Sequence, residues 1–286
     1  CRVYIGSMIM ISINTNYGGI FAAKASGQSQ GLVDTAMERL STGKRINSAG
    51  DDAAGQAIAT RLTAEIQGLS MASRNAADAQ SMVDTAEGAM QEVHTILLRM
   101  RELAVQSANG TLTDADRSHT DAEFQQLEAE ITRISDNTKW AGKGLIDGSL
   151  STGSAVSFQI GEGANQTIAV TIANFAATAP AISTVSQGVS TATKAQASIT
   201  RLDTAIANVS SERGKLGAVS NRLTSTMNNL DQINVNLSAS KGRIEDADFA
   251  AETGNLAKGQ ILQQAATAML AQANASKLSV LTLVRG

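Results

Sequence analysis

The chain has 286 residues, a formal net charge of -3 at pH 7 and 3% aromatic residues, with one proline and one cysteine, Cys1. The acidic balance gives no electrostatic basis for binding nucleic acid, whose binders carry a basic face. A single cysteine excludes a disulfide framework and a thiolate metal cluster. Few aromatic residues and almost no proline indicate long, thin helices that pack through small residues.

No apolar run approaches the roughly 18 to 20 residues that a membrane-spanning helix needs, so no membrane segment is predicted. The apolar stretch from Met8 to Ile13 is too short for a secretory core, and no small-residue cleavage site follows it. Export through a cleavable signal peptide is therefore not expected. Residues 1–10 match nothing around them and are predicted to be an extension or artefact.

The first predicted helix, from Ile20 to Leu40, is alanine-rich and only mildly apolar. It contains two glycines, each of which costs about 1 kcal/mol relative to alanine in a helix interior. The stretch from Thr42 to Gly50 should end it. Asp51 or Asp52 can then accept hydrogen bonds from free backbone N–H groups, so we interpret this acidic pair as a helix cap rather than a metal site.

The longest predicted helix carries apolar or small residues from Ile58 to Ala104, and from Leu69 onward they recur in alternating steps of three and four. This is the heptad pattern of a helix that packs lengthwise against other helices. At 1.5 Å per residue it would reach roughly 70 Å, too long for a compact core to bury. It should run to about Ala108 and end at Asn109–Gly110.

Another helix is predicted from about Thr113 to Asp136 and should fold back on the long helix that precedes it. Its apolar stripe consists of Phe124, Leu127, Ile131 and Ile134. Residues 135–149 are then rich in turn formers, and Trp140 is interpreted as an anchor beneath that loop.

The spacing of apolar residues next changes from the helical period to a period of two. Apolar and polar residues alternate over 156–160 and again over 168–172, and Gly161 to Asn165 supply a turn, which predicts a β-hairpin. The segment from Phe175 to Gly188, which holds Pro180, is predicted to be a loop.

A heptad stripe resumes in the C-terminal half, so the partner of the long N-terminal helix should be C-terminal. Its members are Leu202, Ile206, Val209, Leu216, Leu223, Met227, Leu230 and Leu237. The last helix is again alanine-rich, and Gly254 and Gly259 should loosen it. The order weak helix, strong helix, hairpin, strong helix, weak helix predicts that the two terminal helices meet. The predicted fold is mainly α, with long antiparallel helical rods in a coiled-coil-like bundle, a small β-hairpin and paired terminal helices.

Motifs for catalysis or cofactor binding are missing from the sequence. His94 and His119 have no ligand partner at metal spacing, and no nucleophile, nucleotide-binding or zinc-protease motif occurs. Residues 161–163 resemble a phosphate loop only superficially, since no helix follows them. The acidic run from Glu245 to Asp248 lacks the spacing of a calcium loop and is interpreted as a solvated helix start. We predict no enzyme activity, no cofactor and no metal.

The function that the sequence does indicate is self-assembly. Marginal helices at both ends can become ordered when neighbouring subunits supply apolar surface. A head-to-tail contact whose rotation does not close produces an open helical filament. The residues expected to support filament assembly are Leu69, Val83, Met90, Val93, Leu97, Leu223, Leu230, Ile261, Leu262 and Leu270.

Several long strings identify a family resemblance. The N-terminal ones are SINTN at Ser12 to Asn16, RLSTGKRINSAGDDAAGQAIATRL at Arg39 to Leu62 and RELAVQSANGT at Arg101 to Thr111. The C-terminal ones are GRIEDADFA at Gly242 to Ala250 and QILQQAATAMLAQAN at Gln260 to Asn274. Together they resemble the terminal signatures of bacterial flagellin.

The resemblance implies a short flagellin that lacks the variable outer domains. Residues 11–50 and 240–286 would form the inner-tube region (D0), and residues 51–239 the surrounding shell (D1). The chain would be an extracellular structural subunit that polymerises into the flagellar filament used for motility, exported through the flagellar type III apparatus without a cleavable signal peptide. Expected partners are other flagellin subunits, an export chaperone at the C-terminal helix, the filament cap and the hook-filament junction proteins.

The resemblance also implies recognition of the monomer by an innate immune receptor, the flagellin-sensing Toll-like receptor. The corresponding contact residues here are Arg99, Leu103 and Glu123. Two other interpretations remain open from the sequence. One is a hook-filament junction protein, which shares flagellin-like ends, and the other is a coiled-coil translocator that inserts into membranes.

Overall fold

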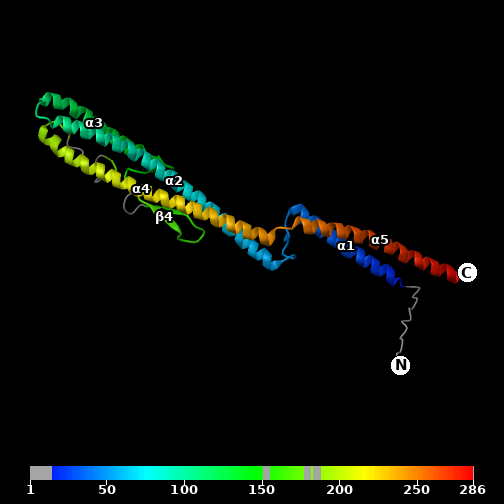
Figure 1. Ribbon diagram of the computed structural model, residues 1–286. Coiled ribbons are helices and arrows are strands. Elements are labelled where there is room, and N and C mark those ends of the chain that lie inside the picture. Colours follow the sequence, from blue (N-terminus) through cyan, green and yellow to red (C-terminus); the bar gives the residue numbers. More distant parts are fainter. Residues whose placement is uncertain (1–14, 151–154, 177–181, 183–187, 286) are drawn as a thin grey trace. The chain divides into compact units, whose positions relative to one another are not determined.

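The computed structural model describes residues 15–150, 155–176, 182 and 188–285, with side chains through residue 276. The predictions on Pro180 and on residues 1–10 lie outside this part of the chain. The molecule divides into two compact units (Figure 1). Unit 1 combines Cys1–Thr63 with Ser238–Gly286, and unit 2 is Ala64–Leu237.

Unit 1 contains the two terminal helices, α1 (Tyr17–Thr42) and α5 (Phe249–Arg285), lying side by side along their length (Figure 1). They run antiparallel, because the Asn16 side chain at one end contacts Ala273 O, whereas Arg39 at the other end binds Glu252. The predicted meeting of the two weak helices is confirmed. Gly43, with a left-handed φ of 71°, closes α1 at the predicted break.

The acidic pair that follows α1 acts as predicted, as a cap. Asp52 Oδ1 accepts from Gly55 N at 2.9 Å and so caps α2 (Ala53–Ser107). Asp51 closes the preceding turn by accepting from Ser48 N at 2.8 Å and Asn47 N at 3.1 Å, and these hydrogen bonds lower the pKa of the Asp51 carboxyl.

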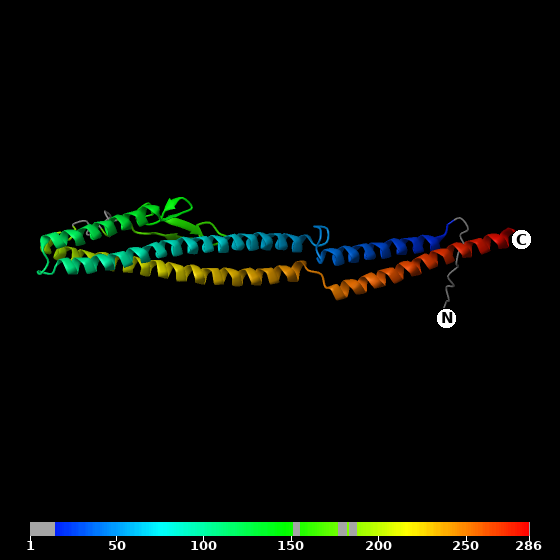
Figure 2. The same cartoon turned by 90° about the horizontal axis from the view of Figure 1, so that it is seen from above.

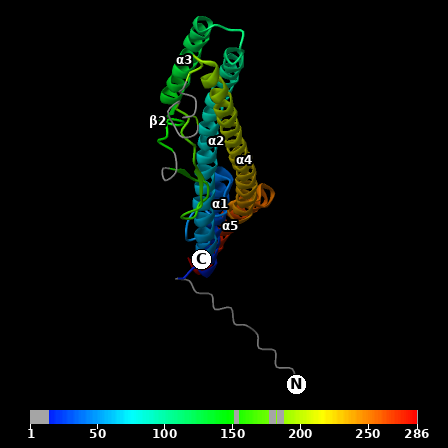
Figure 3. The same ribbon diagram turned by 90° about the vertical axis from the view of Figure 1, so that its left-hand side faces the viewer.

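Unit 2 is a bundle of α2, α3 (Asp114–Asn137) and α4 (Ala192–Glu245), which lie beside one another in Figures 1 and 3. The helix predicted from about Thr113, α3, begins with a capping box between Thr113 and Asp116. Leu69, Ala72 and Leu230 form a small separate cluster, and most other residues of the predicted apolar stripes enter one main core. Its largest fully buried side chains include Phe124, Phe175, Met90, Leu97, Met100 and Ile131.

The predicted hairpin is present as β3 (Val156–Gln159) and β4 (Thr167–Val170), paired antiparallel with Val156 opposite Val170. Asn75 Nδ2 of α2 donates to Gln159 O at 2.9 Å, which holds the hairpin beside α2 (Figure 2).

A second, shorter hairpin was not predicted. It consists of β1 (Lys139–Trp140) and β2 (Lys143–Gly144), and its two turn residues have positive φ, 47° at Ala141 and 81° at Gly142. Two such residues make the tight turn that suits the twist of a hairpin. Trp140 packs, partly buried, against the core of unit 2.

Candidate assembly surface

The contact between α1 and α5 is made by small residues spaced seven apart. Gly19, Ala22, Ser29 and Ala36 are buried on α1, the last three seven residues apart, and Gly259 and Ala266 are buried on α5, also seven apart. A Cβ built on Gly259 would lie 2.8 Å from Val33 Cγ2 and 3.5 Å from Ser29 O. The two backbones therefore approach closely while burying little apolar surface. Gly259 permits this approach, a packing role that its predicted loosening of the helix did not include.

The large apolar side chains of unit 1 instead face outward. Phe21 is 75% exposed, Ile261 66% and Met269 63%, values that a stable water-facing surface rarely combines on neighbouring helices. The same two helices also expose Tyr17, Ile20, Leu32, Met37, Phe249 and Leu262.

Part of this surface is hollowed. A groove of about 440 Å³ runs between α1 and α5 and is lined by Phe21, Ala22, Leu262, Met269 and other, mostly apolar or small residues. An apolar groove flanked by exposed apolar side chains is the kind of surface that another helix covers.

Two connecting segments of unit 1, Gly43–Arg45 and Glu245–Ala247, are hydrogen-bonded to each other, and we call this pair the connector clasp. Arg45 N donates to Glu245 O at 2.7 Å, and Ala247 N donates to Gly43 O at 3.0 Å. Lys44 and Asp246 form an isolated antiparallel bridge. The clasp therefore joins the chain just after α1 to the chain just before α5.

Charged side chains reinforce the clasp. The Glu245 carboxylate lies 2.5 Å from Lys44 Nζ and 3.5 Å from Lys241 Nζ, and its residue is only 9% exposed. The hydrogen bond from Lys44 is the main reason that the pKa of Glu245 lies below its usual value. The prediction of a solvated acidic run is thus wrong at Glu245. It holds at Asp248, which begins α5 by accepting from Ala250 N at 2.9 Å.

A second acidic group lies between α1 and α5. Glu252 Oε1 accepts from Arg39 Nη1 at 2.9 Å, and Glu252 Oε2 accepts from Asn255 Nδ2 at 3.1 Å. Hydrogen bonds from Asn255 and Arg39 lower the pKa of Glu252, although its partial burial opposes this.

The residues predicted to support filament assembly divide into two groups. Those on α2 and α4 are at most 6% exposed and form the internal packing of unit 2: Leu69, Val83, Met90, Val93, Leu97, Leu223 and Leu230. Their direct role is to hold the subunit together. On α5, Ile261 and Leu262 are exposed, and Leu270 is half-buried. Only this second group offers surface to a neighbouring molecule.

Polar contacts between α2 and α4 also recur at heptad spacing, a feature that the apolar pattern did not predict. The α2 members are Ser73, Gln80, Glu87 and Arg101, and their α4 partners are Asp231, Ser220, Arg213 and Asp203. The seam between them contains Ala72, Ala76, Ala79 and Ala86. Alanines specify register weakly, so these polar contacts add to larger buried residues such as Val83, Met90 and Leu97 in aligning α2 with α4.

The α2–α3 end of unit 2 holds the three residues assigned to receptor contact. Arg99 and Glu123 are exposed and bind each other, with Arg99 Nη2 2.9 Å from Glu123 Oε1. This bond is the main reason that the pKa of Arg99 is raised. Leu103 is only 2% exposed and belongs to the core, so its side chain presents almost no surface to a partner.

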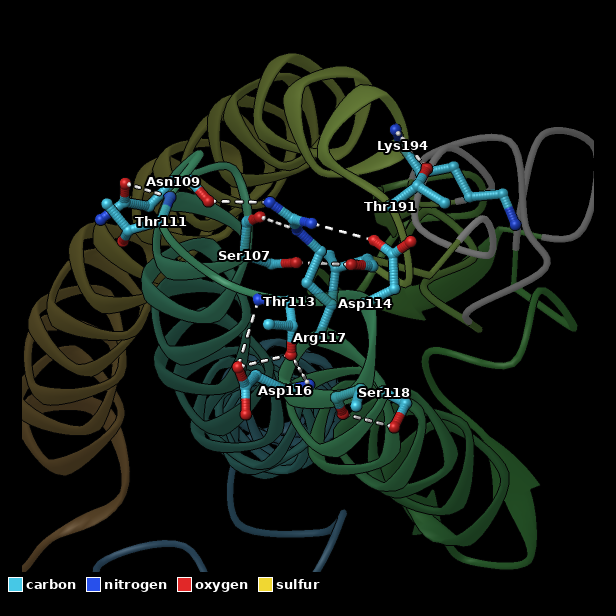
Figure 4. A network of polar contacts seen from close by, with 12 residues as sticks. Ser107, Asn109, Thr111, Thr113, Asp114, Asp116, Arg117, Ser118, Thr191 and Lys194 are labelled. Atoms are coloured by element: carbon cyan, nitrogen blue, oxygen red, sulfur yellow. Dashed lines mark hydrogen bonds and ion pairs between the residues drawn. The ribbon is translucent and has the colours of Figure 1, made fainter.

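A buried arginine holds this end together (Figure 4). Arg117 of α3 donates through Nε to Ser107 O at 2.9 Å and through Nη2 to Asn109 O at 2.8 Å, and it pairs with Asp114 at 3.0 Å. The two carbonyls at the C-terminal end of α2 are thereby satisfied. Sequence reasoning overlooked Arg117 because a single arginine in a polar helix gives no signal of burial.

No group of His, Cys, Asp and Glu in the described part of the chain could hold a metal ion. Among the described residues, no helix is both long enough and apolar enough to cross a bilayer.

Comparison with known proteins identifies the family. The model of the bacterial flagellin N-terminal helical region matches residues 13–151, and that of the C-terminal helical region matches residues 199–284. The chain belongs to the bacterial flagellin family. It is 42% identical over 273 residues to a flagellin of Halalkalibacterium halodurans, covering 96% of this chain and 99% of that protein. It is 39% identical over 302 residues to a Bacillus subtilis flagellin, with the same coverage of both chains.

A solved structure agrees. The crystal structure of Bacillus cereus flagellin matches 55% of this chain and 88% of its own, with 32% identity and a TM-score of 0.50. Flagellins are structural proteins rather than enzymes. This flagellin is therefore a structural subunit of the flagellar filament, in which it assembles with further copies of itself.

Proposed function

We propose that this flagellin builds the filament through a division of roles between its two units. Unit 1 contains the inner-tube region, D0, expected from residues 11–50 and 240–286, and unit 2 forms most of the shell, D1, expected from residues 51–239. The observation that carries this proposal is the exposed apolar surface of α1 and α5, together with the groove between them. Such a surface gains most from burial against neighbouring copies.

Seeded polymerisation tests the proposal. Purified monomer is added to filament fragments, and growth is followed by electron microscopy and far-UV circular dichroism. We expect tubular filaments, and a strong loss of growth when Ile261 is replaced in Ile261→Ser. The matched control is Gln260→Ser, at the neighbouring exposed position of the same helix. Equal growth of both variants would argue against a buried role for this face of α5.

We further propose that the chain is exported without a cleavable signal peptide, with a flagellar chaperone bound to α5 before assembly. The support is the same exposed surface, because a free subunit with apolar α5 side chains needs protection from aggregation. The filament cap and the hook-filament junction proteins would contact the subunit during and after assembly. Size-exclusion chromatography with the chaperone should show a complex that Ile261→Ser weakens and Gln260→Ser preserves. The intact mass of the filament subunit checks for signal-peptide cleavage.

A second role is recognition of the monomer by the flagellin-sensing Toll-like receptor. The supporting observation is that Arg99 and Glu123 lie exposed and paired, so they offer a charged patch to a partner. We assign them as direct contacts. Leu103 would contribute from the core, by fixing the spacing of α2 and α3 beneath that patch.

A receptor-reporter assay with purified monomer tests this role. Arg99→Ala and Glu123→Ala should each reduce the signal. Arg133→Ala, which removes a similarly exposed ion pair with Glu130 on α3, should not. Unchanged signalling by the first two variants would overturn the assignment.

A further inference from the structure

The loop between α2 and α3 carries Asn109–Gly110, the one Asn-Gly pair in the 286-residue sequence. Both residues are exposed, and Figure 4 places Asn109 beside Thr111 and the Arg117 side chain. We propose that Asn109 is a site of spontaneous deamidation, a covalent modification that requires only water as co-reactant.

The reaction balances without any oxidant or cofactor. The backbone nitrogen of Gly110 loses its proton to base and attacks Cγ of Asn109, forming an N–C bond and a five-membered succinimide ring. The side-chain nitrogen leaves and takes up a proton, so ammonia is released. Water then opens the ring at one of its two carbonyls. The product is aspartate, or isoaspartate if the chain now runs through the side-chain carbon.

The loop geometry favours the attack. Asn109 Oδ1 accepts from Thr111 N at 3.2 Å, which folds the side chain over the Gly110 peptide and polarises the Cγ carbonyl. A Cβ built on Gly110 would meet no atom within 4 Å apart from its chain neighbours, so the loop is open on that side of the glycine. Among the described residues, none accepts a hydrogen bond from Gly110 N. The nucleophile is therefore free.

Two other sites in the chain lack these features. Asn47 is followed by serine, is half-buried, and its side-chain Nδ2 donates to Lys44 O at 3.3 Å. Asp147–Gly148 could form the same ring, but a Cβ at Gly148 would lie 2.5 Å from Asn174 Nδ2, so this site is crowded. Burial raises the pKa of Asp147, yet hydrogen bonds from Ser149 outweigh it and lower that pKa, which keeps the carboxylate ionised and a poor electrophile.

Conversion would loosen the end of the bundle. Asn109 O accepts from the buried Arg117. In isoaspartate the backbone continues through Cγ and is one atom longer, and the former Asn109 carbonyl becomes a free α-carboxylate outside the chain path between α2 and α3. Either product also places a negative charge near the C-terminal end of α2, where the helix dipole is already negative.

The test incubates the purified full chain in mildly alkaline buffer at physiological temperature. Peptide mapping by mass spectrometry and enzymatic methylation of isoaspartate give the rate at each site. We expect Asn109 to convert at least about tenfold faster than Asn47, and Gly110→Ala to slow Asn109 by about tenfold or more. Gly110→Ala should fold normally, because the added methyl group enters open space.

The same measurement on chain unfolded in urea decides whether the loop permits or blocks the reaction. The proposal would be overturned if Asn109 converted more than about tenfold more slowly in the folded chain than in urea. So would equal rates at Asn109 and Asn47. Asn109→Asp carries the charge without the altered backbone, so faster hydrogen exchange at residues 105–117 in the isoaspartate fraction than in Asn109→Asp would show that the lengthened backbone loosens this end of the bundle. Equal exchange would overturn that consequence.

Discussion

Unit 1 and unit 2 are both built from antiparallel helices with a seven-residue repeat, yet they bury very different side chains. The unit 2 core contains Phe124, Met90 and Leu97, all fully buried, whereas the seam between α1 and α5 contains alanine, serine and glycine. Burying a large apolar side chain contributes about 1.5–3 kcal/mol, and an alanine contributes far less. Unit 2 can therefore be stable alone, and unit 1 depends on what covers its exposed face. The same repeat yields a subunit core in one case and an assembly surface in the other.

The largest effect should come from truncating the unit 2 core. Phe124→Ala should lower the free energy of unfolding by about 3–5 kcal/mol, because it leaves a cavity among fully buried neighbours. The matched change in unit 1, Phe249→Ala, removes a side chain that is 57% exposed and should alter the monomer by less than about 1 kcal/mol. Urea unfolding followed by circular dichroism measures both. Similar losses would contradict the contrast between the units.

The next effect concerns the buried arginine of unit 2. Arg117→Ala removes the donors to Ser107 O and Asn109 O and should cost about 2 kcal/mol of stability, since both bonds involve a charged donor. Arg133→Ala removes one partner of the exposed Arg133–Glu130 ion pair and should change the stability little. Thermal unfolding compares the two variants, and an equally small change in both would show that Arg117 is not an anchor.

A smaller effect tests the seam of unit 1. Alanine substitutions at two glycines of α5, Gly254 and Gly259, should change its stability in opposite directions. In Gly254→Ala the added methyl group enters open space, so this variant should stabilise α5 by about 1 kcal/mol. Gly259→Ala places a methyl group against Val33 and should push α1 and α5 apart, offsetting that gain by about 1–3 kcal/mol. Hydrogen exchange of the two helices distinguishes these outcomes, and unit 2 should not respond. Stabilisation by both variants would mean that the helices can separate without cost.

The smallest expected effect is a dependence of unit 1 on acid. The folded pKa values of Glu245 and Glu252 lie below their usual values, so their contribution is complete above the usual glutamate range. It is lost as the pH falls through the lowered folded values. We expect less than about 1 kcal/mol from Glu245, because its partner Lys44 is half exposed. Hydrogen exchange of the connector clasp should rise on acidification, and Glu245→Gln should flatten that rise. An unchanged acid response in the variant would exclude Glu245 as its source.

Most of the elements and their pairing could be predicted from the sequence, although the short hairpin of β1 and β2 could not. Heptad spacing located α2, α3 and α4, alternation located β3 and β4, and similar composition paired α1 with α5. Asp52 was assigned correctly as a cap. These features are local or periodic, since a helix face or a cap depends on residues a few positions apart.

The exposed surfaces and the partners of the charged groups became known from the folded chain alone. Leu103 lies in the core, although its position beside the heptad stripe left its orientation open. Glu245 is held by Lys44, and Arg117 reaches the end of another helix. The role of the small residues in the α1–α5 seam could be assigned only from the structure, in which the two helices are in contact. Burial and ion pairing depend on groups that are distant in sequence, and a periodic pattern carries no information about which distant group fills a given space.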